Sequence, residues 1–145
     1  MAYQNILIPI DGSETSLSAI QHAVEFSKAF KSKITIVQVM TLDPYIATEY
    51  LSNTQGNQLI ERAKQFIQDN LNVVQEKFAN DGITVETKLL EGENISQTIT
   101  QAVDDLNIDL VILSSHGRTG LKKLIMGSVA QSLITDLHIP VFVIK

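Results

Sequence analysis

The stretch LVILSSHGRTGLKKLIMGSVAQSLI, residues Leu110 to Ile134, decides the fold because it places a strand pattern, a glycine-bearing loop and a helix pattern in direct succession. Its first four residues are continuously apolar, which is typical of a strand buried on both faces of a parallel sheet. The helix pattern begins at Gly127-Ser128 and continues past the stretch, and we expect its inward face to carry Val129, Ala130, Leu133, Ile134 and Leu137. This succession predicts one strand and one covering helix of an α/β protein.

Four more apolar runs, rich in valine and isoleucine, alternate with segments of helical period in the rest of the chain. The alternation predicts an α/β fold, a three-layer sandwich in which helices cover both faces of a five-stranded parallel sheet. Gly82 is placed to end one helix, and Asn94 with Gln97 is spaced as a capping pair for the next. We expect the other strands at Ile6–Ile10, Ile34–Met40, Ile83–Leu89 and Pro140–Ile144, and the other helices at 17–30, 59–78 and 95–106.

The composition is that of one globular domain spanning residues 1–145. Hydrophobic residues make up 44% of the chain and charged residues 19%, and the formal net charge of -5 argues against general nucleic-acid binding. Cysteine is absent, which excludes disulfides, thiol catalysis and cysteine-ligated metals. The N-terminus has no signal-peptide pattern, and no apolar stretch approaches the roughly 20 residues that span a bilayer. We therefore expect a cytoplasmic protein that binds neither membrane nor nucleic acid.

Two loops are candidates for a binding site, because ligands of open parallel sheets bind beyond the carboxyl ends of the strands, where the strand order reverses. They are Asp11-Gly12-Ser13 after the first strand and Ser114–Ser128 after the fourth. Gly117, Gly120 and Gly127 let the backbone come close to a ligand. Free amides and the helix dipole at the start of the last helix favour an anion, most naturally a phosphate.

Each of these residues also has a purely structural explanation. The glycines can simply shape a tight turn, and Arg118 with the nearby lysines can be solvated surface charge. Asp11 can cap the first helix as well as accept hydrogen bonds from a ribose or adenine, and the two roles are compatible. The loop is not a Walker loop, since no Gly-Lys-Ser or Gly-Lys-Thr follows, and it lacks the G-x-G start of a dinucleotide fingerprint.

At these two loops the chain resembles the universal stress protein family, in particular the single-domain members related to bacterial UspA. The stretches NILIPIDGSETS, ITIVQV, SSHGRTGLKKLIMGSVAQSLI and IPVFVIK carry the resemblance, which covers essentially the whole chain. The family's nucleotide signature is a glycine, two residues, a second glycine, nine residues, and then glycine with serine or threonine. Gly117, Gly127 and Ser128 match the later part of this signature, whereas Ser114 stands at the first glycine.

The resemblance implies a strand order and a ligand. The family fold is a five-stranded parallel sheet of order 3-2-1-4-5, of the adenine nucleotide alpha hydrolase-like type. In its ATP-binding members Mg2+ or Mn2+ would accompany the phosphates and be held mainly by them, so no dedicated protein metal site is expected. The implied ATP contacts are Asp11 at the nucleoside, Val39 at the adenine, Gly117 under the ribose and phosphates, Gly127, Ser128 and Val129 at the phosphate chain, Pro9 and Leu113 lining the pocket, and Ser114 and Arg118 beside it.

The resemblance also implies a function. We expect an ATP-binding stress-response protein that acts as a nucleotide-dependent regulator and forms a homodimer through the apolar edge Pro140–Ile144. His116 has no carboxylate partner in sequence, so we expect no catalytic residue and at most slow ATP hydrolysis. The alternative is a dimeric interaction module without nucleotide, because Ser114 departs from the signature. A phosphorelay receiver is disfavoured, since its acidic pair and phosphoacceptor aspartate are missing.

Overall fold

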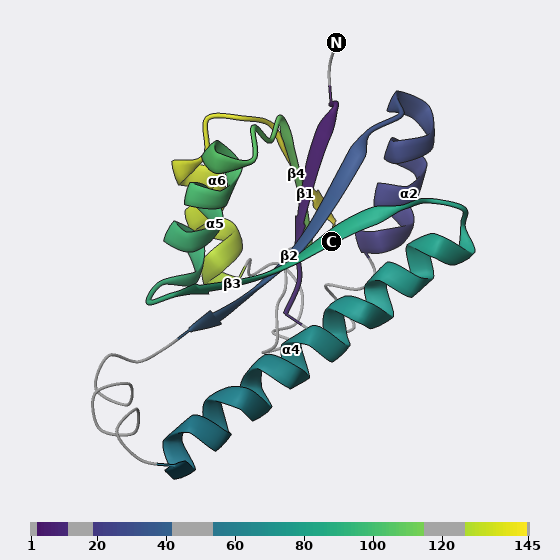
Figure 1. The fold of residues 1–145 in the computed structure, drawn as a ribbon. Helices are drawn as coiled ribbons and strands as arrows, with labels where there is room; N and C mark the ends of the chain where they lie inside the picture. The colour runs from purple at the N-terminus through teal and green to yellow at the C-terminus, as the bar shows by residue number, and fades with distance from the viewer. Residues whose placement is uncertain (1–2, 12–18, 42–53, 115–126, 145) are drawn as a thin grey trace.

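The computed structural model describes residues 3–11, 19–41, 54–114 and 127–144. Within these ranges five strands form one parallel sheet of order β3-β2-β1-β4-β5, which confirms the expected order, and four helices flank it (Figure 1). None of the helices in the described ranges is long and apolar enough to cross a membrane. The elements are β1 (Asn5–Pro9), α2 (Ala19–Phe30), β2 (Lys33–Thr41), α4 (Thr54–Asn80), β3 (Val85–Gly92), α5 (Ile95–Asp105), β4 (Leu110–Ser114), α6 (Ser128–Asp136) and β5 (Val141–Ile144).

Helices cover both faces of the sheet, as the sequence predicts. Figure 1 shows α5 and α6 on one face and α2 and α4 on the other. Successive side chains of a strand point to opposite faces, so Ile6 and Ile8 of β1 pack in the core under α2 and α4, whereas Leu7 packs under α5 and α6. The interior strands β2, β1 and β4 are covered on both faces, and their largely apolar runs reflect this.

The strand order reverses between β1 and β4, and this reversal fixes where the loops separate. The chain moves from β1 outward to β2 and β3 on one side, and from β4 outward to β5 on the other. At the amino edge the Asp109 carboxylate accepts the backbone N–H groups of Gln4 and Asn5 at 2.8 and 2.9 Å, which ties the start of β4 to β1. At the carboxyl edge, β1 is followed by α2 on one face of the sheet and β4 by α6 on the other (Figure 1), and a crevice can open between these two connections.

The two predicted helix boundaries around β3 are confirmed. Gly82 has φ of 77°, a left-handed conformation, and the Ile83 N–H donates to the Phe78 carbonyl at 2.9 Å, which ends α4. The Asn94 side chain accepts the backbone N–H of Gln97 at 3.0 Å and caps α5. Between these two boundaries β3 pairs with β2 from Val85 to Gly92.

Several details differ from the sequence pattern. The long helix α4 begins at Thr54 and not at Leu59, because the polar residues before Leu59 carry no apolar period to mark its first turn.

Ile134 is expected to face inward from α6 but is 42% exposed, and the buried residues of this nine-residue helix are Ala130 and Leu133. The inward face of α6 is therefore narrower than its apolar pattern. The third strand begins at Val85 and not at Ile83, since Ile83 still takes part in the turn that ends α4. None of these differences changes the layers.

Candidate functional site

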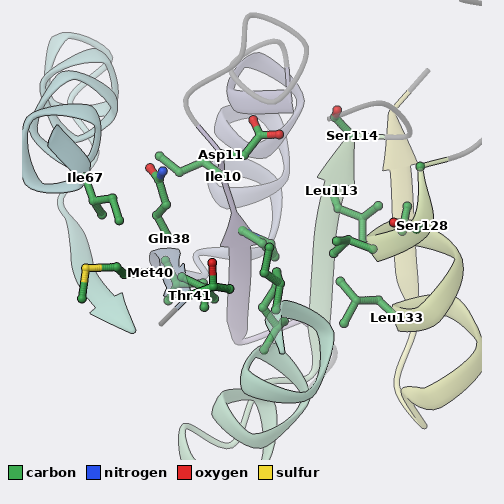
Figure 2. Close-up of a pocket in the computed structure, with 18 of the residues that line it drawn as sticks. Ile10, Asp11, Gln38, Met40, Thr41, Ile67, Leu113, Ser114, Ser128 and Leu133 are labelled. Carbon is green, nitrogen blue, oxygen red and sulfur yellow. The ribbon is translucent and has the colours of Figure 1, made fainter. Parts of the chain in front are cut away.

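A pocket of about 640 Å³ opens at the carboxyl edge of the sheet, where β1, β2 and β4 end (Figure 2). A volume of this size suits a small organic ligand or cofactor. Most of its walls are apolar, and polar groups enter mainly from the strand ends and the start of α6. The residues that line it are Pro9, Ile10, Asp11, Val37, Gln38, Val39, Met40, Thr41, Ala63, Phe66, Ile67, Ile95, Ile99, Leu113, Ser114, Gly127, Ser128, Val129, Ala130 and Leu133.

Most of the site residues expected from the sequence lie together in this pocket. The parallel sheet brings them together, because the carboxyl ends of β1, β2 and β4 share one edge. Gly117 and Arg118, as well as His116, lie outside the described residues. The expected residues that line the pocket are Pro9, Asp11, Val39, Leu113, Ser114, Gly127, Ser128 and Val129.

The start of α6 supplies backbone donors to the pocket. Gly127 is the N-cap, with φ of -60° and ψ of 154°, and it has no side chain to cap the helix. The first helical hydrogen bond runs from the Gln131 N–H to the Gly127 carbonyl at 3.0 Å. The N–H groups of Ser128 and Val129 precede that bond and so have no partner within the helix. Together with the helix dipole, they favour an anion at this end of the pocket.

The end of β2 supplies a second set of backbone groups. β2 pairs with β1 only as far as Val37, whose carbonyl accepts the Ile10 N–H at 2.8 Å, whereas its pairing with β3 continues to Thr41. Peptide groups of alternate residues face the same side of a strand. The N–H and C=O of Val39 therefore face the side where β1 has ended. The Val39 N–H can donate a hydrogen bond to the edge of a planar ring placed there, and the Val39 C=O can accept one.

Asp11 and Ser114 lie at the mouth of the pocket, after β1 and at the end of β4 (Figure 2). Both are partly buried, and both already interact with other groups of the protein. Asp11 is the one carboxylate among the described residues that line the pocket. The predicted capping of the first helix by Asp11 involves a segment outside the described residues. The part of the chain that the structure describes brings no three His, Asp or Glu side chains together as a metal site.

Sequence reasoning missed the walls that the helices and the face of β2 contribute. Phe66 and Ile67 come from α4, Ile95 and Ile99 from α5, and Gln38 from β2. The helical residues carry no signal of their own, because they belong to ordinary apolar stripes. Gln38 did carry a signal, since a carboxamide interrupts the apolar end of the run Ile34–Met40.

The fold and this pocket define a doubly wound α/β protein with a pocket at the carboxyl edge of its sheet, where ligands of such folds bind. The family model described as the universal stress protein family matches residues 2–145. The chain therefore belongs to the universal stress protein family. It is 30% identical over 143 residues to universal stress protein MJ0531 of Methanocaldococcus jannaschii, covering 99% of this chain and 82% of that relative.

Solved structures agree with the fold. Hypothetical protein MJ0577, the subject of a structure-based assignment of biochemical function, has a TM-score of 0.79 and 28% identity, covering 100% of this chain and 97% of that chain. A universal stress protein from Archaeoglobus fulgidus in complex with dAMP has a TM-score of 0.70 and 19% identity, covering all of both chains. A universal stress protein in complex with cAMP has a TM-score of 0.63 and 20% identity, covering 100% of this chain and 98% of that chain. At these last two identities the likeness concerns the fold alone.

Proposed function

We propose that this protein binds ATP in the pocket at the carboxyl edge and acts in the cytoplasm as a nucleotide-dependent, homodimeric regulator of the stress response. One observation carries the proposal: the Val39 peptide edge and the start of α6 open into the same pocket. The first suits the hydrogen-bonding edge of a base, and the second suits phosphates. Adenine nucleotides bound to universal stress proteins of the same fold, dAMP and cAMP, support this choice of ligand.

A divalent cation fits the pocket only as part of the nucleotide complex. Asp11 is the one carboxylate among the described lining residues, and Mg2+ prefers several oxygen ligands in near-octahedral geometry. Phosphate oxygens and water would have to supply most of them. We propose that Mg2+ or Mn2+ enters with ATP, without a dedicated protein site.

The proposal is tested by titrating nucleotide-free protein with ATP and Mg2+ in a calorimeter, with UTP as the control. We expect ATP to bind with a Kd well below about 1 mM and UTP to bind more weakly. A Kd of about 1 mM corresponds to a binding free energy of roughly -4 kcal/mol. The same Kd for ATP and UTP would show that the base is not read. If no heat of binding is detected at millimolar ATP, the proposal is wrong.

One observation favours the alternative of an interaction module without nucleotide. Ser114 lines the pocket where the family signature has glycine, so its side chain occupies space near the ligand. Native mass spectrometry of the purified protein separates the two functions, because a co-purifying adenine nucleotide belongs only to the first. If Ser114 obstructs the ligand, Ser114→Gly will bind ATP more tightly than the natural protein.

The homodimer that we propose uses the free edge of β5. The sheet has two edge strands, and β3 carries the charged side chains Glu86, Lys88 and Glu91, which discourage pairing with another chain. The four residues of β5 carry no charge. β5 is therefore the edge that a second copy can extend.

Val143→Pro is expected to convert this dimer to monomer. The Val111 N–H donates to the Pro140 carbonyl at 3.1 Å, so Val141 and Val143 of β5 direct their peptide groups away from β4. Proline at position 143 removes an outward N–H and leaves the β4 ladder intact. Light scattering coupled to size-exclusion chromatography measures the mass. Val143→Thr, which keeps the N–H, should remain dimeric, and a dimeric Val143→Pro would exclude pairing through this edge.

A further inference from the structure

The pocket holds a buried carboxamide that the proposed nucleotide contacts leave unassigned. Gln38 is 4% exposed, and of the polar side chains buried in the described residues it alone lines the pocket. Figure 2 shows it on the side of the pocket near Ile67 and Ile10, away from Leu113 and Ser128. The walls around it are apolar. A buried carboxamide in such surroundings is costly unless its donors and acceptors find partners.

The hydrogen bond to α4 fixes which end of this carboxamide is satisfied. The Asn70 Nδ2 donates to the Gln38 Oε1 at 3.3 Å. A glutamine carboxamide has two donors on its nitrogen besides the acceptor oxygen. With the oxygen held by Asn70, the Gln38 Nε2 has no hydrogen-bond partner among the described residues. The group that Gln38 offers to a ligand is therefore an N–H donor.

We propose that Gln38, oriented by Asn70, is a specificity-determining residue that donates a hydrogen bond to a ring nitrogen of the bound purine. This inference rests on the proposed nucleotide function and names the chemistry of the base that the site selects. An N–H donor needs an acceptor, and the adenine ring offers N1, N3 and N7, whereas its exocyclic amino group is itself a donor. Gln38 thus reads the ring and not the 6-amino group.

The inference is tested by pairing Gln38→Met with ATP analogues in which a ring nitrogen is replaced by C–H, namely 1-deaza-, 3-deaza- and 7-deaza-ATP. Methionine keeps the length and apolar stem of glutamine but cannot donate. We expect Gln38→Met to weaken ATP binding about 3- to 10-fold, the effect of one neutral hydrogen bond. One deaza analogue should bind the natural protein more weakly by a similar factor, and that analogue should lose no further affinity in Gln38→Met.

Asn70→Asp separates the proposed orienting role of Asn70 from a purely structural role, because the two roles predict different ATP affinities for this variant. A carboxylate only accepts hydrogen bonds, so Gln38 must turn its nitrogen toward residue 70 and its oxygen toward the pocket. We expect this variant to bind ATP at least as weakly as Gln38→Met, with an unchanged thermal unfolding temperature, because Asn70 is partly exposed. If the natural protein binds ATP and neither substitution changes the Kd, this inference is wrong. If the natural protein binds no ATP, the proposed function fails and the inference fails with it.

Discussion

Phe78→Ala is expected to lower the free energy of unfolding by about 3 to 5 kcal/mol, the usual cost of emptying a phenylalanine site in a packed core. Phe78 is fully buried near the end of α4 and packs in the core layer shared with α2 and the sheet. Since a domain of this size is stabilised by only about 5 to 15 kcal/mol, the variant will sit close to its unfolding threshold. Urea denaturation followed by circular dichroism measures the loss.

Phe66→Ala is the matched control, because it makes the same change on the same helix. Phe66 is 54% exposed and lines the pocket, so its removal should cost less than about 1 kcal/mol. A large difference between the two losses in the free energy of unfolding is expected if α4 buries only one of its faces. Equal losses would mean that α4 does not lie on the sheet in the orientation found here.

The strands could be predicted well because burial leaves a direct mark on composition. The run Leu110–Leu113 is apolar at every position since both faces of β4 are covered, and Val85–Leu89 alternates since β3 is an edge strand. Periodicity does not state which strands are neighbours, however. The order of the sheet came from the family resemblance. Ile134 was misplaced because helical spacing gives the direction of a face but not the width of its contact.

The residues of the candidate site could be predicted where they belong to one contiguous sequence motif. The residues that packing brings to the pocket from distant helices could not be predicted. Gly127 and Ser128 could be assigned from the turn of strand into loop into helix, a pattern that lies within one stretch of sequence. Phe66 and Ile95 line the same pocket from helices that are distant in sequence, and no local pattern links them to it. Gln38 lies between these cases. Its polarity within a buried strand was visible, but its partner on α4 was not.

Ser128→Pro is expected to weaken ATP binding about 10- to 100-fold while leaving the fold intact. The substitution removes one backbone N–H at the first position of α6, and hydrogen bonds to charged groups contribute about 1.5 to 3 kcal/mol. Proline is favoured at this position of a helix, since its fixed φ suits the first turn and the missing N–H has no intrahelical partner. The residue before proline must be extended, and Gly127 already has φ of -60° and ψ of 154°.

Ser128→Ala is the control that separates the backbone from the side chain. It removes the hydroxyl but keeps the N–H, so a phosphate held by main-chain donors should lose much less affinity than in Ser128→Pro. Calorimetric titration with ATP measures both variants, and thermal unfolding verifies that each is folded. If both bind ATP as the natural protein does, the phosphates do not lie at α6. If alanine and proline weaken binding equally, the serine hydroxyl is the group that matters, because only the proline variant lacks the amide.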